Sequence, residues 1–585
     1  MNRICLREFI LLTLLLFFLK SGLFGQRPVP FEAIEAIKTT SPAVWDKNGD
    51  TLYFTSSNSL WFYSIKKGTL KELPHKDSLS GEPRISQDGK SLGVQCGNND
   101  VCIVKLTDGS IAKKTSGEMD SRWDIKPDGS GIAFGGKGFI WSRVSKKGQQ
   151  AHVKKSPEMF GKNELFIDDH NVLTESGIVW IFSPYGSPIE WSPDGTRLFF
   201  LSAKTGWTKI WSMRFDGTDI RQETFGAGDD RDFRVLRNGS IIFVSNRNKR
   251  MEWSLWMKSP GHKANFLYGK DCMIRGINLS PDEKKISFQY STPVFPEELF
   301  IYDMRSKKTI LITHNSPSLP GSLRFPKAVR FSSGNRSIEG MLFIPDTTKK
   351  DNSLPAIVLL HGGPSMHDGF SWSAMRQYLC SRGFVIFDIN YTGSAGYGKA
   401  FEESDRFRIG IEDCNDAANA ALYLATLPWV DKTAIGVTGS SYGGYLTNLV
   451  IGRYPELFSA AVDWFGITDW RTIFRVKRLH PVVKFFFLDR LGDSLTNKDL
   501  YRMSSPVTYA KVIKTPLMIV HGDSDFVVPF SQAVEFYDSL KANNKTVDFI
   551  KYSNEGHGWQ RKETRLDALN KMTAWFDKYL KKEGK

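Results

Sequence analysis

The sequence predicts a two-domain protein, an N-terminal all-β propeller followed by a C-terminal domain of alternating strands and helices. Three observations support this prediction. The chain has 585 residues, which exceeds the roughly 250–300 residues at which a single hydrophobic core stops growing. A short strand pattern repeats through the first half of the chain. Beyond about residue 320, that repeat is replaced by apolar strands separated by helical segments.

The first 25 residues have the pattern of a secretory signal. Arg3 and Arg7 precede the apolar run Phe9–Leu19, and small or turn-forming residues follow it. The run is too short for an ordinary transmembrane helix. We therefore expect a signal peptide over residues 1–25, cleaved after Gly25, and an exported protein, periplasmic or extracellular, with no stable membrane insertion. Retention of this segment as an uncleaved anchor is the alternative.

Six copies of a turn dipeptide followed by an apolar run indicate the propeller. They begin at residues 48, 88, 128, 194, 238 and 282. Asn-Gly and Asp-Gly favour tight hairpins, so the flanking runs are predicted strands. The spacings of 40, 40, 66, 44 and 44 residues are typical of propeller blades, which leave few exposed sheet edges. We predict six blades over residues 26–304, with seven as the alternative because of the long third interval. An open all-β array would expose its edges.

The second domain is expected over residues 327–585, after a Ser- and Pro-rich linker at 305–326. Apolar runs such as PAIVLLHGG (355–363) and PLMIVHG (516–522) alternate there with helical stretches. This alternation predicts a mostly parallel sheet covered by helices on both faces.

The turn Gly-Ser-Ser-Tyr-Gly at 439–443 lies between the strand AIGVT and a helical segment. A strand, Gly-x-Ser-x-Gly and a helix form the nucleophile elbow of α/β-hydrolases. Ser441 occupies the central position, because a frame centred on Ser440 would need a glycine where Thr438 stands. Ser441 is therefore the candidate nucleophile, and the second domain is predicted to be an α/β-hydrolase.

A serine nucleophile needs a histidine base and a carboxylate that orients it. In this fold the chain order is Ser, acid, His. Asp523 and Asp525 directly follow the strand that ends at His521, and either could supply the acid. His557 lies downstream in a glycine-flanked loop and is the predicted base. His521 and His480 are expected to be structural or surface residues.

The oxyanion that forms during acyl transfer needs hydrogen-bond donors. HGGP (361–364) follows an apolar strand, where the oxyanion loop of this architecture is expected. Backbone N–H groups of Gly362 or Gly363, together with that of Tyr442, are the predicted donors.

The pocket for the P1 side chain is predicted to be apolar. Tyr442, Trp464, Phe465 and Val528 lie next to the catalytic motifs, and no acidic residue there suits a basic P1 side chain. Of these, Trp464, Phe465 and Val528 are the candidate substrate-binding residues. The alternative is that all of them are ordinary core residues.

These motifs resemble those of the prolyl oligopeptidase family of serine peptidases, specifically its acylaminoacyl-peptidase and dipeptidyl-peptidase-like branch. The matching stretches are HGGP (361–364), NYTGSAGYG (390–398), GSSYGGY (439–445), SPVTYA (505–510), HGDSDFVVP (521–529) and EGHG (555–558). The resemblance implies a propeller followed by an α/β-hydrolase, and it places the acid on Asp525 rather than Asp523.

The sequence departs from this family at two positions. Thr392 stands where many relatives have an arginine, and Phe526 and Val527 follow Asp525 where many have an arginine that can hold a substrate carbonyl. No paired-glutamate motif for clamping a free N-terminus is evident, because the pair Glu297-Glu298 precedes a strand and looks structural. Release of dipeptides is therefore not supported by the sequence.

The leading functional prediction is an exported serine peptidase that hydrolyses short peptides through Ser441, Asp525 and His557, with the propeller limiting access. An esterase with the same triad, and a propeller binding protein with an inactive hydrolase domain, are the alternatives. No metal or organic cofactor is implied. The net charge is +15 but the basic residues are scattered, so no nucleic-acid partner is expected. The sequence leaves open whether the chain forms a homo-oligomer.

Cys96 and Cys102 are the two cysteines of the exported chain that lie close in sequence. They flank a short turn between two predicted strands of one blade. Antiparallel partners in a non-hydrogen-bonded pair have Cα atoms about 4.5 Å apart, near the lower end of the disulfide range. We predict a disulfide, which an oxidising compartment would preserve. Two buried free thiols are the alternative.

Overall fold

The computed structural model describes residues 29–581, apart from 31, 34–35, 75–77, 87, 97–99, 114–122, 126–131, 135–138, 145–149, 156–162, 168–169, 176–188, 317–322, 347–352, 477–478 and 480. The expected signal over residues 1–25 and His480 lie outside the described residues. Within these ranges, no helix has the length and apolar character needed to cross a membrane.

The first domain consists of antiparallel sheets, each built from strands consecutive in the chain. Four-stranded sheets are formed by β1 (Val44–Trp45), β2 (Thr51–Ser56), β3 (Ser59–Ser64) and β4 (Thr69–Glu72), by β5 (Leu79–Ile85), β6 (Ser91–Cys96), β7 (Asp100–Lys105) and β8 (Ile111–Lys113), and by β11 (Phe139–Val144), β12 (Gln150–Lys155), β13 (Asn163–Ile167) and β14 (His170–Glu175). Further four-stranded sheets are β15 (Ile189–Trp191), β16 (Arg197–Ser202), β17 (Lys209–Arg214) and β18 (Arg221–Gln222), then β19 (Asp230–Val235), β20 (Ile241–Ser245), β21 (Ser254–Lys258) and β22 (Asn265–Tyr268), and finally β23 (Met273–Leu279), β24 (Lys285–Thr292), β25 (Phe295–Asp303) and β26 (Lys308–Leu311). A two-stranded sheet pairs β9 (Trp123–Ile125) with β10 (Ile132–Phe134).

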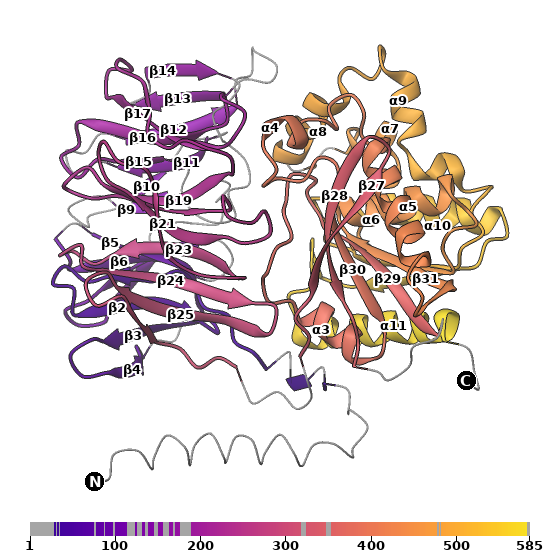
Figure 1. Cartoon of the computed structure of the whole chain (residues 1–585), viewed down its shortest axis with the longest axis horizontal. Helices are drawn as coiled ribbons and strands as arrows, with labels where there is room; N and C mark the ends of the chain where they lie inside the picture. The colour runs from indigo at the N-terminus through magenta and orange to yellow at the C-terminus, as the bar shows by residue number, and fades with distance from the viewer. Residues whose placement is uncertain are drawn as a thin grey trace, which may run out of the picture.

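These sheets close into a ring. The first strand of each sheet contacts the first strand of the next, in the order β1, β5, β9, β11, β15, β19 and β23, and β23 contacts β1 again. Asn278 in β23 also donates its side-chain N–H to the Ala43 carbonyl beside β1, at 2.9 Å. The ring confirms the propeller and excludes the open array. Figure 1 shows its sheets stacked on one side of the molecule.

The described part of the propeller has seven sheets, so the alternative of seven blades holds and the preferred count of six is wrong. The additional blade, β11–β14, lies within the 66-residue interval between the repeats at 128 and 194. Its second strand, β12, has the sequence QAHVKK and follows Lys-Lys-Gly-Gln. It therefore lacks both the Asn-Gly or Asp-Gly turn and the apolar run by which the other blades were recognised.

The domain boundaries differ from the prediction at two places. β26 pairs with β25 in the last blade, so the propeller extends to Leu311 and takes in the start of the expected linker at 305–326. At the other end, Val29 is buried in the second domain's core, and its N–H donates to Ser381 Oγ at 3.2 Å. Val29, four residues after the expected cleavage site, therefore packs its apolar side chain in the core of the hydrolase domain rather than on the propeller.

Cys96 and Cys102 form the predicted disulfide, with Cα atoms 5.8 Å apart. In the register of β6 and β7, Cys102 faces Val94 and Cys96 faces Asp100. The two cysteines are therefore diagonal neighbours rather than direct partners. Cys272, Cys380 and Cys414 are buried free thiols.

The second domain is built on an eight-stranded sheet with the order β27-β28-β30-β29-β31-β32-β33-β34. Its strands are β27 (Lys327–Ser333), β28 (Arg336–Phe343), β29 (Leu354–Leu360), β30 (Val385–Asn390), β31 (Val430–Ser440), β32 (Ala460–Trp464), β33 (Leu517–Gly522) and β34 (Val547–Tyr552). In this spatial order, each pair of neighbouring strands from β30 through β29 to β34 is parallel. Every residue of β29 and β30 is buried, as expected of parallel strands covered on both faces.

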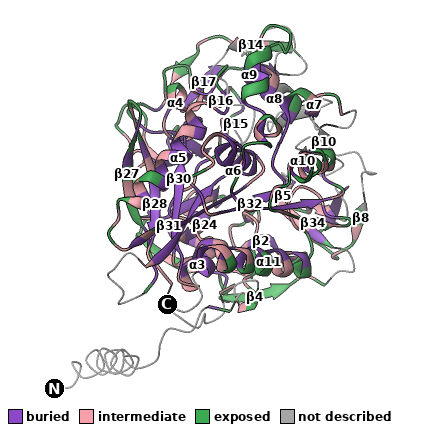
Figure 2. Ribbon diagram, turned by 90° about the vertical axis from the view of Figure 1, so that its right-hand side faces the viewer, coloured by how far each residue is buried: buried purple, intermediate pink, exposed green. Residues whose placement is uncertain are grey.

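Helices cover both faces of this sheet. The helices are α3 (Ala374–Ser381), α4 (Lys399–Glu402), α5 (Glu412–Ala425), α6 (Tyr442–Arg453), α7 (Trp470–Ile473), α8 (Pro481–Leu491), α9 (Lys498–Met503), α10 (Phe530–Ala542) and α11 (Lys562–Leu580). Helices α5, α6 and α10 share one hydrophobic cluster with the sheet, and α3 and α11 share the other. Figure 2 shows α6 and the central strands as buried. The fold is that of an α/β-hydrolase.

The two domains lie side by side and share specific contacts (Figure 1). The indole N–H of Trp253, in the propeller, donates to His367 Nδ1 at 3.2 Å. The side-chain amide of Asn246 donates to the Gly396 carbonyl at 2.7 Å. His367 follows β29 and Gly396 follows β30. The loops after the carboxyl ends of these two strands therefore face the propeller.

Candidate active site

Ser441 lies at the sharp turn between β31 and α6. Its φ of 58° is in the left-handed region, which a residue other than glycine rarely adopts. Its backbone N–H donates to the Trp464 carbonyl at 2.9 Å, which fixes the turn against β32. Gly443 permits close packing against the end of β29, because a Cβ atom there would overlap the Leu360 carbonyl oxygen. The turn presents the serine side chain at the N-terminus of α6.

The structure brings Ser441, His557 and Asp525 into one hydrogen-bonded line. Ser441 Oγ lies 2.9 Å from His557 Nε2, and His557 Nδ1 lies 2.7 Å from Asp525 Oδ2. The second carboxylate oxygen of Asp525 accepts backbone N–H groups from Val527 at 2.8 Å and Val528 at 2.9 Å. The three residues follow β31, β34 and β33, so all lie at the sheet edge that faces the propeller.

Asp523, the other candidate acid, points away from this line. Its side chain accepts a hydrogen bond from the Asn554 backbone N–H at 2.8 Å and forms an ion pair with Lys551 at 3.1 Å. These interactions tie the loop after β33 to β34 and to the turn that follows β34. Sequence spacing left both aspartates open, and the structure brings only Asp525 to His557.

The Asp525 carboxylate is fully buried and ionised. Burial by itself would raise the Asp525 pKa, but the side-chain hydrogen bonds from His521 and His557 lower it to about 2. An ionised carboxylate can only accept a hydrogen bond, so the proton of His557 belongs on Nδ1. His557 Nε2 then has a free lone pair directed at the Ser441 hydroxyl.

The HGGP loop lies beside the nucleophile. A Cβ atom on Gly362 would lie 3.2 Å from the Ser440 carbonyl oxygen and 3.5 Å from the Ser441 Cβ, so this glycine lies directly beside the nucleophile. The loop is held by Tyr391, whose hydroxyl donates to the His361 carbonyl at 2.7 Å and whose ring stacks on His361. Gly363 follows with a φ of 123°, in the region that favours glycine. Tyr442 opens α6, and helix N–H groups in the first turn lack intrahelical partners.

The predicted P1 residues differ in whether their side chains lie next to the catalytic histidine or in the core. Phe465 contacts the base directly, edge-to-face with the His557 ring at 4.7 Å between centroids. Trp464 is buried and donates its indole N–H to Thr438 Oγ1 at 3.2 Å. Val528 is only 1% exposed, and its backbone N–H holds Asp525 instead. Val528 therefore supports the acid from within the core and does not line a pocket.

The Tyr442 side chain also belongs to the core, where its hydroxyl donates to Asp413 Oδ2 at 2.5 Å. Sequence reasoning missed Trp559, whose ring lies 5.2 Å from that of Phe465. The sequence feature that could have identified Trp559 is its position two residues after His557. Phe526, beside the acid, is 64% exposed.

The propeller glutamates serve the structure of their own blade. Glu297 forms a two-point ion pair with Arg275, at 2.6 and 2.7 Å. Glu298 is buried and accepts the backbone N–H groups of Asn315 at 2.7 Å and Ser316 at 3.0 Å. Both carboxylates are therefore used within the fold. In the part of the chain that the structure describes, no cluster of three or more His, Cys, Asp or Glu side chains could hold a metal ion.

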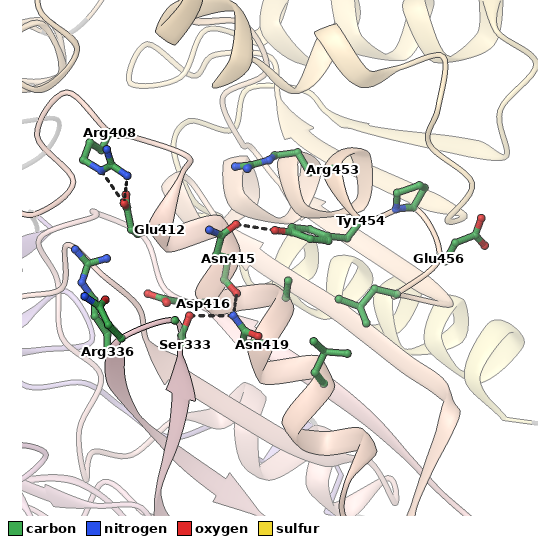
Figure 3. Close-up of a pocket in the computed structure, with 16 residues that line it drawn as sticks. Ser333, Arg336, Arg408, Glu412, Asn415, Asp416, Asn419, Arg453, Tyr454 and Glu456 are labelled. Carbon is green, nitrogen blue, oxygen red and sulfur yellow. Dashed lines mark hydrogen bonds and ion pairs between the residues drawn. The ribbon is translucent and has the colours of Figure 1, made fainter.

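A cavity of about 970 Å³ lies away from this site, between the β27–β28 turn, α5 and the C-terminal end of α6. Figure 3 shows its charged lining, which includes Arg336, Arg453 and Asp416. Asp416 also accepts the Thr392 backbone N–H at 2.7 Å, so this carboxylate fixes the loop after β30. Ser441, Asp525 and His557 do not line this cavity.

Comparison with known proteins places the second domain in a family. Residues 370–583 match the model of the prolyl oligopeptidase family. The chain is 29% identical over 315 residues to the uncharacterised peptidase YuxL of Bacillus subtilis, covering 52% of this chain and 47% of that protein. It is 23% identical over 498 residues to dipeptidyl-peptidase 5 of Porphyromonas gingivalis, covering 83% of this chain and 63% of that protein. The chain thus spans about half the length of the first of these relatives.

Solved structures share the whole architecture. A puromycin hydrolase matches with a TM-score of 0.81 at 18% identity, covering 95% of this chain and 96% of that one. Pyrococcus horikoshii acylaminoacyl peptidase matches with a TM-score of 0.70 at 20% identity, covering 96% and 98%. At these identities the likeness shows the fold alone. The second domain is therefore similar in sequence to the prolyl oligopeptidase family, and the whole chain shares the fold of these solved structures.

Proposed function

We propose that the chain is an exported serine peptidase that hydrolyses short peptides. The observation that carries the proposal is the hydrogen-bonded line from Ser441 through His557 to the buried carboxylate of Asp525. The match of residues 370–583 to the prolyl oligopeptidase family supports the same chemistry. Export rests on the signal pattern of the first 25 residues.

The proposed reaction begins when Ser441 Oγ attacks the scissile carbonyl carbon. His557 Nε2 takes the hydroxyl proton as the C–O bond forms, and Asp525 stabilises the resulting imidazolium without taking its proton. Backbone N–H groups of Gly362 or Gly363 and of Tyr442 stabilise the oxyanion.

The tetrahedral intermediate then collapses. The C–N bond breaks, and His557 gives its proton to the leaving amine. Water then enters and attacks the acyl carbonyl carbon while His557 Nε2 takes one of its protons. The second tetrahedral intermediate collapses, the bond between the acyl carbon and Ser441 Oγ breaks, and His557 returns the proton to Ser441 Oγ, which releases the carboxylic acid and restores the hydroxyl. Because the catalytic sheet edge faces the propeller, we expect short or unfolded peptides to reach the site more easily than folded proteins.

Labelling with a fluorophosphonate probe tests this proposal. The wild-type protein should be labelled, and Ser441→Ala should not. Ser440→Ala is a matched control in the same turn and should keep its label. A wild-type protein that resists labelling would favour the propeller binding module with an inactive hydrolase domain.

A matched amide and ester substrate pair tests the substrate class. A peptidase should turn over the peptide amide, with product masses that identify the cleaved bond. Turnover of the ester alone would support the esterase alternative. N-terminal sequencing of the exported protein tests export, and a sequence starting at Gln26 is expected.

A further inference from the structure

His521 is a second histidine close to Asp525. It is fully buried at the end of β33, and its Nε2 lies 2.9 Å from the Val528 carbonyl oxygen. The same nitrogen lies 3.4 Å from Asp525 Oδ2. This is the oxygen that His557 Nδ1 contacts at 2.7 Å. Two imidazole rings therefore approach the same carboxylate oxygen.

The contacts of His521 define where its proton lies. A carbonyl oxygen can only accept a hydrogen bond, so His521 Nε2 carries the proton that faces Val528. His521 Nδ1 is buried without a hydrogen-bond partner. A second proton there would leave a buried donor unpaired, which is costly, so the ring is neutral. The Nε2–H thus points at the Val528 oxygen with the Asp525 oxygen close beside it.

Packing holds this ring in place. The edges of Phe465 and Phe530 contact it in T-shaped arrangements, with centroids at 6.4 and 5.7 Å. These rings fill the space around the imidazole, whereas the hydrogen bond from its Nε2–H to the Val528 carbonyl oxygen fixes which way that nitrogen points.

We propose that His521 is a positioning residue, whose N–H holds the Asp525 carboxylate in the orientation that receives the His557 proton. The inference rests on the proposed function. The backbone N–H groups of Val527 and Val528 fix one carboxylate oxygen of Asp525, and the N–H group of His521 restrains the other oxygen. A carboxylate restrained at both oxygens cannot rotate about its bond to Cβ, so its remaining lone pair faces His557.

Several ionisable groups surround His521. Asp525 and, beyond it, His557 lie on one side. Asp463 in β32 is also near; it is fully buried, and burial raises its pKa to about 6. Lys551, the partner of His521 in the adjacent strand β34, directs its ammonium group to Asp523 instead. The Nε2–H of His521 therefore faces one acidic side chain, that of Asp525.

Two substitutions at His521 separate a hydrogen-bond role from simple packing. His521→Gln retains a side-chain N–H that can reach Val528 and Asp525, whereas His521→Leu fills the space without a donor. Phe530→Leu is the matched control, because it removes one of the packed rings but leaves the N–H in place.

We expect His521→Leu to lower kcat by about 10- to 100-fold with little change in KM, since misplacing a catalytic group by ~1 Å can cost ~10²-fold. The acid limb of its kcat/KM profile should move to higher pH. Without the His521 donor, the Asp525 charge is more available to the protonated form of His557, which cannot act as base. His521→Gln should recover most of the rate, and Phe530→Leu should keep the wild-type pH profile.

A second measurement reads the same interaction without turnover. A proton shared between His557 Nδ1 and Asp525 should give a far-downfield signal in the proton NMR spectrum, and His521→Leu should shift or broaden it. If the wild-type protein gives this NMR signal but is not labelled by the fluorophosphonate probe, the proposed function is refuted. The effect of His521→Leu on the signal then still tests the positioning role. Equal losses in His521→Leu and His521→Gln, or a folded His521→Leu with wild-type rate, pH profile and downfield signal, would overturn the inference.

Discussion

The indole N–H of Trp253 in the propeller donates a hydrogen bond to Nδ1 of His367 in the hydrolase domain, at 3.2 Å. Their rings meet edge-on, with centroids 5.7 Å apart. The guanidinium of Arg231 stacks on the other side of Trp253, 3.5 Å from the ring centroid. His367 belongs to the loop that begins with HGGP, so this contact joins the propeller to the segment beside Ser441.

The Trp253–His367 contact predicts a specific acid sensitivity. Burial, reinforced by the nearby Arg231 charge, lowers the His367 pKa from 6.5 to about 3. As pH falls below 6.5, the unfolded chain binds a proton at this residue that the folded protein refuses until about pH 3. Stability from this group is therefore complete above pH 6.5 and is lost progressively as pH falls toward 3.

Substitution of His367 by Gln should remove this contribution. The variant should be less stable than wild type at pH 7, because the Trp253 donor loses its partner. Its melting temperature should then fall less steeply between pH 6.5 and 3. Thermal unfolding across this range measures the effect, with the exposed His262→Gln as control. Parallel pH curves for His367→Gln and wild type would contradict the prediction.

The proposed triad predicts large losses of kcat for substitutions at its three members and a small loss at Asp523. Ser441→Ala and His557→Ala should each lower kcat by about 10⁴-fold or more while the fold is retained, because only the oxyanion donors and binding remain. Asp525→Asn should also be severe, since the amide no longer selects the Nδ1–H tautomer of His557. Asp523→Asn should be mild. Steady-state kinetics with circular dichroism spectra checks this order, and a larger loss for Asp523→Asn would reassign the acid.

The apolar P1 prediction now rests on Phe465, which contacts the His557 ring. Mass spectrometry of products from a mixed peptide library should show cleavage after apolar residues. Phe465→Ala should weaken that preference, because it removes apolar surface next to the base. Dominant cleavage after Lys or Arg in the wild-type digest would refute the idea.

The Cys96–Cys102 disulfide should contribute modest stability and leave catalysis unchanged. Closing so short a loop adds about 2–3 kcal/mol at most by the chain-entropy estimate. The paired variant Cys96→Ala, Cys102→Ala should therefore unfold at a lower temperature and keep the wild-type kcat/KM. Non-reducing peptide mapping checks the bond itself. Free, alkylatable thiols at both positions would rule it out.

Sequence reasoning succeeded where the signal is local. Asn-Gly and Asp-Gly turns marked most of the blades, and the glycine spacing around Ser441 marked the elbow. It failed at β12, whose polar sequence pairs between β11 and β13 because neighbouring strands impose the geometry. It also failed at Val528, where an apolar residue beside a catalytic motif faces the core.

The sequence by itself determined the order of the two domains, the nucleophile elbow and the chain order of candidate acid and base, because turn chemistry and strand–helix alternation depend on near neighbours. Residue spacing left Asp523 and Asp525 open as partners of His557, and the tertiary structure decided for Asp525, as the family resemblance implied. Only the tertiary structure decided that His521 Nε2 lies 3.4 Å from this carboxylate and that His367 meets the propeller. These outcomes depend on hydrogen bonds between residues brought together from separate strands and domains. Their geometry is set when the sheet edges and blades pack, which no local pattern encodes.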